Sequence, residues 1–219
     1  MRFTKMEKVK QEEALNALTE LPPAPDREML MAFAKAMRVV AAEKTFDEMS
    51  VLDIVGASGF TSRTFYNHFR SKYDLLFWSY VVEDYRALQM PGGDCPMRTC
   101  RDWIYNSVRR IYNDRSLLKG VFIERSWEER LCETYIEHCC RMACNFIVRR
   151  GAKRISCDTV RLMRHYFAGN IHESALWLAE ENPMPVEDFA EFLIRAMPTP
   201  LAKLLLKDKC ISKERNKQP

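Results

Sequence analysis

Apolar residues recur at three- and four-residue spacing along most of the chain, and no stretch shows the alternation that is typical of a strand. In the first half, this spacing predicts helices at about residues 27–44, 51–57, 61–69 and 72–90. Ser50 and Thr61 precede the two short helices, where their side chains can accept hydrogen bonds from free backbone amides. Gly59 breaks the chain between them. The pattern therefore predicts a helix-turn-helix held between two longer helices.

The second half is predicted to be helical as well. Residues 91–93, Pro-Gly-Gly, are the clearest interruption, and helical patterns follow at about 98–113, 116–150, 156–181 and 185–206. The stretch 116–150 is expected to be two helices, with a break near Gly120 or Ser126. Pro183 ends one helix and Pro185 can start the next. The predicted fold class is all-α.

Composition and charge narrow the class of protein. The formal net charge is +4, and it comes from the residues after position 202, so a basic tail at 207–219 is predicted to be solvated. No apolar run is long enough to span a membrane, so no membrane partner is expected. Charges stand where a secretory signal would have its apolar stretch, which predicts a cytoplasmic protein.

The third predicted helix carries the chemistry of the first half. Between Phe60 and Lys72 the chain has several bases and no acid. Its first turn offers donors that can reach base edges in the major groove, and Tyr66 and His68 can bond phosphates. Lys72 opens the next helix, where free amides and the helix dipole favour a phosphate. This pattern indicates DNA binding, and an ordinary solvated helix face is the alternative.

Residues 28–77 resemble the N-terminal domain of the TetR (tetracycline-repressor-like) transcriptional regulators. The resemblance rests on FDEMSVLDIV at 46–55, SGFT at 58–61 and TFYNHFRSKYDLL at 64–76, the last being similar to the family signature TLYxHFxSKxxLL. One departure is Lys44-Thr45, which replaces the glycine usual before the position of Phe46. The resemblance implies that these side chains contact operator DNA: Ser50, Thr61, Ser62, Arg63, Thr64, Tyr66, Asn67, His68 and Lys72.

The same resemblance implies a plan for the whole chain. An N-terminal extension (1–25) precedes a helix-turn-helix DNA-binding domain (26–77), a helical effector-binding and dimerisation domain (78–206) and the basic tail. In this plan the last two long helices form a homodimer interface. Apolar stripes at 158–180 and 186–206 agree with it, and Ala168 and Gly169 would allow close helix approach. The aromatic candidates for lining a small-molecule pocket are Trp103, Tyr112, Trp127, Tyr135, Phe146, Tyr166 and Trp177.

The eight cysteines include no C-x-x-C pair, and no second Cys/His pair completes a zinc site. They are interpreted as reduced, mostly buried residues, with a metal or redox site as the alternative. No phosphate loop, G-x-S-x-G or H-E-x-x-H motif is present, so neither an enzyme nor a cofactor is predicted.

The sequence thus predicts a homodimeric DNA-binding transcriptional regulator, a repressor released from its operator by an unidentified small molecule. A helical dimeric adaptor without specific DNA binding is the alternative function.

Overall fold

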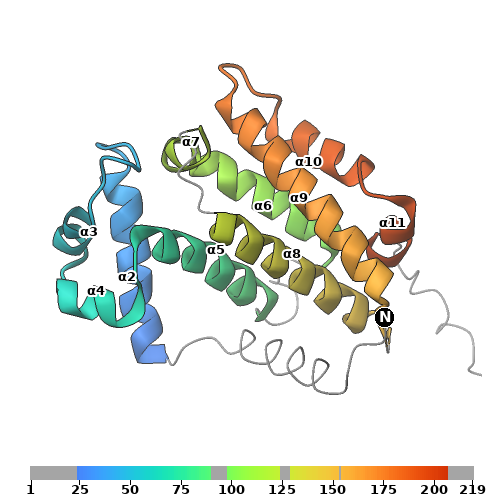
Figure 1. The fold of residues 1–219 in the computed structure, drawn as a ribbon, viewed down its shortest axis with the longest axis horizontal. Helices are drawn as coiled ribbons and strands as arrows, with labels where there is room; N and C mark the ends of the chain where they lie inside the picture. The colour runs from blue at the N-terminus through green and yellow to red at the C-terminus, as the bar shows by residue number, and fades with distance from the viewer. Residues whose placement is uncertain (1–23, 90–97, 124–128, 153, 207–219) are drawn as a thin grey trace, which may run out of the picture.

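The computed structural model describes residues 24–89, 98–123, 129–152 and 154–206, and these parts of the chain contain helices and no strand (Figure 1). The predicted all-α fold class is therefore confirmed. The helices are α2 (Ala24–Val40), α3 (Val51–Ser58), α4 (Ser62–His68), α5 (Lys72–Gln89), α6 (Cys100–Asn113), α7 (Arg115–Ile123), α8 (Glu129–Arg149), α9 (Cys157–Ala179), α10 (Val186–Arg195) and α11 (Thr199–Leu205).

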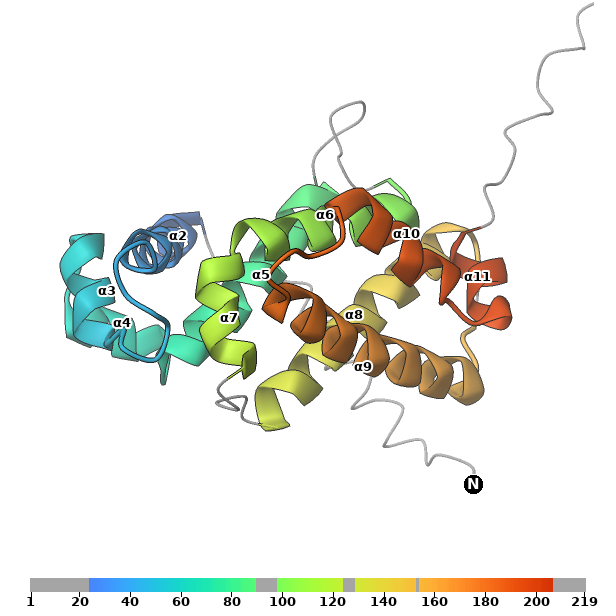
Figure 2. The same cartoon turned by 90° about the horizontal axis from the view of Figure 1, so that it is seen from above.

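The helices fall into two groups. Helices α2, α3 and α4 lie together at one end of the molecule, and α6 to α11 make up the rest, as both views show (Figures 1 and 2). Helix α5 leads from the first group into the second and packs against both α2 and α8. In the second group α9 packs on α8 and α7, while α10 lies along α6. No described helix is long and apolar enough to cross a membrane.

Capping residues set the ends of the two short helices as predicted. Ser50 caps α3 in a reciprocal arrangement, in which the Asp53 amide donates to Ser50 Oγ at 3.1 Å and the Ser50 amide donates to Asp53 Oδ2 at 2.8 Å. Helix α3 ends at Gly59, whose φ of 76° lies in the left-handed region that favours glycine. Thr61 then caps α4 by accepting from the Thr64 amide at 3.1 Å.

Aromatic rings hold this helix-turn-helix on its neighbours. Phe65 of α4 is fully buried, and its ring lies edge-on to Phe33 of α2 at a centroid distance of 5.3 Å. The Phe69 ring lies between the rings of Phe65 and Trp78 of α5, at centroid distances of 5.5 Å and 5.7 Å. Neither α3 nor α4 is long enough to be stable alone, so these contacts fix the angle at which α4 is presented.

Three predicted boundaries differ from the structure. The stretch 185–206 is not one helix, because α10 ends at Arg195 and α11 begins at Thr199. Pro198 lacks a backbone N–H and disfavours the α region at the residue before it. The stretch 116–150 forms two helices, α7 and α8, as predicted; of the two places expected for the break, Gly120 lies inside α7 and Ser126 lies outside the described residues. Helix α2 ends at Val40, four residues earlier than predicted, and turns follow it.

Candidate nucleic-acid interface and internal cavity

Helix α4 exposes one polar face and buries the other. Phe65 points into the core, whereas Tyr66 is 57% exposed and Arg63, Asn67 and His68 are also exposed. All four are side chains for which DNA contact was predicted, and they lie within two turns of one helix. The structure therefore brings this part of the predicted set onto a single accessible surface.

The hydroxyl groups predicted to contact DNA are engaged locally but remain accessible. As helix caps, Ser50 and Thr61 accept hydrogen bonds from backbone amides. Thr61 Oγ1 also lies 2.8 Å from Thr64 Oγ1. Ser50 and Thr61 are exposed, and Ser62 and Thr64 are partly exposed. A hydroxyl has one proton to donate, and that of Ser50 already goes to Asp53 Oδ2 at 2.7 Å, so a phosphate contact at Ser50 would have to replace this bond.

Lys72 lies in a different environment from the one expected for a phosphate contact. Its ammonium donates to the carbonyl oxygens of Phe46 at 2.5 Å, Met49 at 2.9 Å and Asp47 at 3.2 Å. It also lies 4.7 Å from the centre of the Phe46 ring. These three bonds use the three protons of the ammonium, so the side chain ties α5 to the turn before α3. Burial lowers the pKa of Lys72, an effect that the nearby Asp47 charge opposes.

Two acidic residues near this surface, Asp53 and Asp74, have hydrogen-bond partners within the protein. Lys44 lies 2.7 Å from Asp53 Oδ1, and this bond, with those from Ser50, holds the pKa of the Asp53 carboxyl far below its usual range. Asp74 accepts the Arg70 amide at 2.9 Å. Within α4 itself there is no acid, so the exposed face presents the Arg63 charge without a competing carboxylate.

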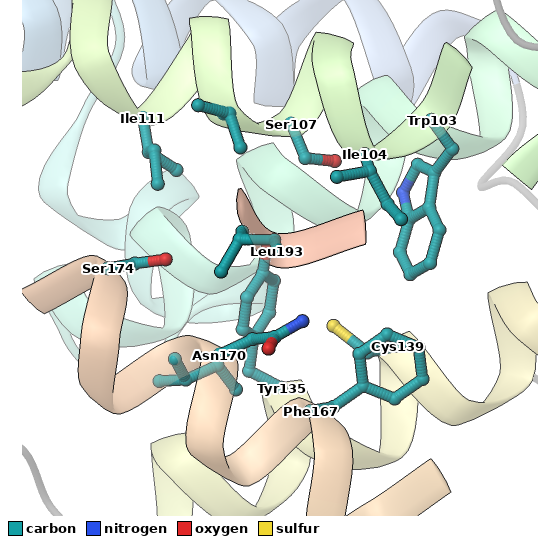
Figure 3. A pocket seen from close by; sticks show the side chains of 12 residues that line it. Trp103, Ile104, Ser107, Ile111, Tyr135, Cys139, Phe167, Asn170, Ser174 and Leu193 are labelled. Atoms are coloured by element: carbon teal, nitrogen blue, oxygen red, sulfur yellow. The ribbon is translucent and has the colours of Figure 1, made fainter. Parts of the chain in front are cut away.

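A cavity of about 80 Å³ lies inside the second group of helices (Figure 3). It is lined from α6, α8, α9 and α10 by Trp103, Ile104, Ser107, Val108, Ile111, Tyr135, Cys139, Phe167, Asn170, Ile171, Ser174 and Leu193. Most of this lining is apolar, and the polar side chains are placed singly among it. This is the composition of sites that bind small organic molecules.

The aromatic residues predicted to line a pocket are distributed over several places. Trp103 and Tyr135 do line the cavity. Tyr112 and Trp177 pack on each other at a centroid distance of 5.4 Å, and Tyr166 bonds the Leu193 carbonyl at 2.7 Å. These three, with Phe146, are absent from the cavity wall, and Trp127 lies outside the described residues.

The small polar residues of the cavity were missed from sequence. Ser107, Asn170 and Ser174 come from two helices and carry no aromatic or charged signal that distinguishes them from other helix positions. Phe167 was read only as part of an apolar stripe. They line one cavity because the fold places α6 and α9 on opposite sides of it, which residue spacing within one helix does not reveal.

A buried carboxylate, Asp84 of α5, stands behind the cavity wall. It accepts hydrogen bonds from Arg110 Nη2 at 2.7 Å, His138 Nε2 at 2.8 Å and Trp103 Nε1 at 3.3 Å. Burial alone would raise the pKa of Asp84, but the Arg110 charge and the bond to His138 hold it below its ordinary value. Asp84 is therefore a buried anion that has its partners in place.

Ion pairs continue from this carboxylate to the first group of helices. Arg110 Nη1 lies 3.6 Å from Glu83, and Glu83 lies 3.1 Å from Arg38 of α2. Arg38 also bonds both carboxylate oxygens of Asp114, at 3.0 to 3.2 Å. The Tyr80 hydroxyl donates to the same Asp114 at 2.8 Å.

The described cysteines are mostly shielded thiols. Burial raises the pKa of Cys100 and Cys140 to about 12 and that of Cys139 well above its ordinary value. A thiol with such a pKa has almost no thiolate at neutral pH and reacts slowly. No group of three metal-binding side chains occurs among the described residues.

Comparison with known proteins agrees with the geometry of the first group. Residues 34–77 match the sequence model described as "Bacterial regulatory proteins, tetR family". The match spans the end of α2, the helix-turn-helix and the start of α5. A search of curated proteins found no match.

Solved structures are similar to the chain at low sequence identity, and the one with a TM-score above 0.5 shares its fold. The "Dihydroxyacetone kinase operon activator DhaS" superposes with a TM-score of 0.57 at 13% identity, over 81% of this chain and 98% of that one. A TetR transcriptional regulator from Streptococcus agalactiae 2603V gives a TM-score of 0.48 at 16% identity, over 83% and 96% of the two chains. Salmonella enterica GusR gives a TM-score of 0.44 at 22% identity, over 85% of this chain and 99% of that one.

The helix-turn-helix, its capping and the matched residues together define a DNA-binding regulator fold. Residues 34–77 are thus similar to the DNA-binding domain of the tetR family of bacterial regulatory proteins.

Proposed function

We propose that this protein is a homodimeric transcriptional regulator that binds a pseudo-palindromic operator through α4. The observation that carries the proposal is the capped, aromatic-anchored α4, whose exposed face holds Arg63, Tyr66, Asn67 and His68. A short helix presented in this way fits the major groove, where residues of its first turn meet base edges. The protein acts by binding and is proposed to have no catalytic role.

The exposed residues divide into two roles. Arg63, with Ser62 and Thr64, lies in the first turn and is proposed to contact bases. Tyr66 and His68, with the cap Ser50, are proposed to bond phosphates and fix the register on the duplex. The Lys72 ammonium is engaged with three carbonyls, so its proposed contribution is to position the turn before α3 and to offer phosphate the start of α5.

The exposed face of α9 supports the proposed dimer. Most apolar residues of this helix serve the core of the protein itself, as Met163, Phe167 and Leu178 do. The opposite face is exposed, and at helical spacing it carries His165, Ala168, Gly169, His172 and Leu176, the last 51% exposed. Small residues in the middle of such a face allow a second helix to approach closely. Two subunits joined here would present two α4 helices to the DNA, as a two-fold operator requires.

The cavity supports a small-molecule effector. A ligand that binds more tightly to the conformation in which the two α4 helices are wrongly spaced would release the operator. Repression with release by the effector is the proposed mode of regulation. The structurally similar DhaS is named an operon activator, so the direction of regulation is a separate outcome to measure.

Fluorescence anisotropy with duplexes from the DNA flanking the gene tests the proposal at about 0.15 M salt, against unrelated DNA as competitor. Specific binding at about 10⁻⁸ M or tighter is expected. Tyr66→Ala and Arg63→Ala should each weaken it about tenfold or more, because each removes a proposed DNA contact. Arg109→Ala is the matched control, since Arg109 is an exposed base on α6, outside the helix-turn-helix.

Equal binding of all variants would refute the proposed contacts. If no duplex from a selection among random sequences binds specifically, the helical adaptor without DNA affinity becomes the better explanation. A size measurement in solution tests the dimer independently of DNA.

A further inference from the structure

The walls of the cavity carry no charge. None of its lining side chains, all of which belong to described helices, is a carboxylate, an amine, a guanidinium or an imidazole. Two of them can ionise, Cys139 and Tyr135, and burial raises the pKa of both, so both are neutral at pH 7. A ligand in this cavity therefore meets dipoles and apolar surface only.

The buried carboxylate behind the wall already has hydrogen-bond partners. Asp84 lies behind Trp103 and is paired with Arg110 and His138. A charged ligand would lose its hydration and find no counter-ion, which disfavours its binding in this cavity. An uncharged ligand does not carry this cost.

One polar atom in the wall lacks a partner. Ser107 Oγ is buried and has no hydrogen bond to any described residue. Figure 3 shows Ser107 on α6 across the cavity from Asn170 and Ser174 on α9. A buried hydroxyl without a partner is unfavourable, so a ligand group that bonds Ser107 would gain affinity from the pairing.

We propose that the cavity binds a small uncharged molecule with an apolar body and one hydrogen-bonding group placed against Ser107. The apolar body would pack against Trp103 and Phe167, whose rings contact each other edge-on at a centroid distance of 5.7 Å. This ligand class deepens the effector role proposed above and rests on it.

Thermal denaturation with four probes of similar size tests the ligand class: toluene, benzyl alcohol, benzylamine and benzoate. At about ten times its Kd, a bound probe raises Tm by about 4 °C in a protein of this length. Benzyl alcohol is expected to do so at the lowest concentration and toluene at a higher one. Benzylamine and benzoate are expected to leave Tm unchanged.

Two variants locate the binding. Ser107→Ala should remove the advantage of benzyl alcohol over toluene, about fivefold in Kd, because the hydrogen bond is lost. Ser174→Leu places a longer apolar side chain in the cavity and should abolish both shifts. The proposal is overturned if a charged probe binds as well as benzyl alcohol, if neither neutral probe binds, or if the shifts persist in Ser174→Leu. None of these results depends on DNA, so failure here is distinct from failure of operator binding.

A different observation concerns how the cavity could communicate with α4. Helix α6 carries Trp103 in the cavity wall and, at its C-terminal end, Asp114. Asp114 holds Arg38 of α2 through bonds to both carboxylate oxygens, and Glu83 links Arg38 to Arg110 on α6. Helix α2 in turn packs against α3 and supports α4 through the Phe33 ring.

We infer that the Arg38–Asp114 pair, reinforced by Glu83, transmits a change in α6 to the helix-turn-helix. A charged pair with two parallel bonds keeps its geometry when one partner moves, so a shift of α6 pulls on α2. Arg38 and Asp114 act as positioning residues, since neither lines the cavity nor lies on the exposed face of α4.

A double-mutant cycle tests this coupling, with Ser174→Leu as a permanent cavity occupant. Hydrogen exchange of the α3 and α4 amides should change about fivefold when Ser174→Leu is made in the wild-type background. The change should vanish when Asp114→Asn or Arg38→Gln is already present. Glu191→Gln is the control, because Glu191 pairs with Arg101 and joins α6 to α10 instead of α2.

Equal changes in all backgrounds, or no change in any, would overturn the coupling. Because the readout is exchange in the protein alone, it stands whether or not an operator is found. Where operator DNA is in hand, its Kd should follow the same non-additive pattern.

Discussion

The two ends of this molecule are stabilised by different means. Around α4 the core is a chain of aromatic rings, from Phe33 through Phe65 and Phe69 to Trp78, and hydrogen-bonded caps hold the ends of the short helices. In the second group of helices a cavity lies beside a buried carboxylate that is surrounded by bases. The first arrangement favours one fixed shape for the surface that is proposed to contact DNA.

The cavity and the buried ion pairs of the second group of helices allow this part of the protein to change conformation. Side chains that line a cavity make fewer van der Waals contacts than fully packed ones. Buried ion pairs fix the relative orientation of their helices but add little net stability. A ligand can therefore shift the balance between conformations of this part at modest cost. Under the proposed function, the difference separates a rigid DNA-binding surface from a ligand-responsive helical domain, and the Arg38–Asp114 ion pair connects the two.

The largest effect is expected from breaking the aromatic core. Phe65→Ala should lower the free energy of unfolding by about 3–5 kcal/mol, because it removes a fully buried ring and leaves a cavity. Denaturant unfolding followed by circular dichroism measures the loss. Tyr66→Ala is the control on the same helix, since its side chain is 57% exposed and should change stability little. An unchanged midpoint for Phe65→Ala would show that α4 is not anchored through this ring.

A comparable loss is expected in the second group from Asp84→Ala. It leaves Arg110 buried without its main counter-ion, which typically costs about 3 kcal/mol. The double variant Asp84→Leu with Arg110→Met should recover part of that stability, since no charge is then left unpaired. Equal destabilisation by the single and double variants would argue against an important ion pair.

The same carboxylate makes stability depend on pH in the acid range. The folded protein holds the pKa of Asp84 below its ordinary value of 3.8, so the unfolded chain binds the proton more readily. The contribution of Asp84 is therefore present above about pH 4 and is lost as the pH falls through the lower, folded pKa. In the double variant, which lacks Asp84, the free energy of unfolding should fall less steeply below about pH 4 than it does in the wild type. Denaturant unfolding at several pH values between about 2 and 5 measures the difference.

A smaller effect is expected from Lys72→Met. Three carbonyl oxygens lose their donor, at a cost of about 2 kcal/mol, and the turn before α3 loosens. The salt dependence of operator binding should stay nearly unchanged, because the ammonium is occupied within the protein. A full loss of one unit in the salt slope with no change in Tm would show instead that Lys72 contacts phosphate through its side chain.

Local chemistry in the sequence was enough to predict the elements around α4. Ser50, Gly59 and Thr61 act through hydrogen bonds and backbone geometry within a few residues, so their roles follow from neighbouring positions. The burial of Phe65 has the same local origin, since helical spacing decides which side of α4 it occupies. The separation of α10 from α11 within 185–206 also has a local cause, because Pro198 lacks an N–H and restricts the residue before it. The apolar spacing on both sides of Pro198 nevertheless predicts one continuous helix.

Tertiary packing decided what the spacing of residues cannot show. The Lys72 ammonium donates to carbonyl oxygens more than twenty residues away in the sequence. Asp84 accepts hydrogen bonds from Arg110 and His138, which lie on two other helices. The cavity exists because α6, α8 and α9 pack with a gap in which Ser107 is left without a partner. Caps and helix faces depend on short-range bonds that a sequence displays directly, whereas a cavity and a buried charge depend on which distant helices meet.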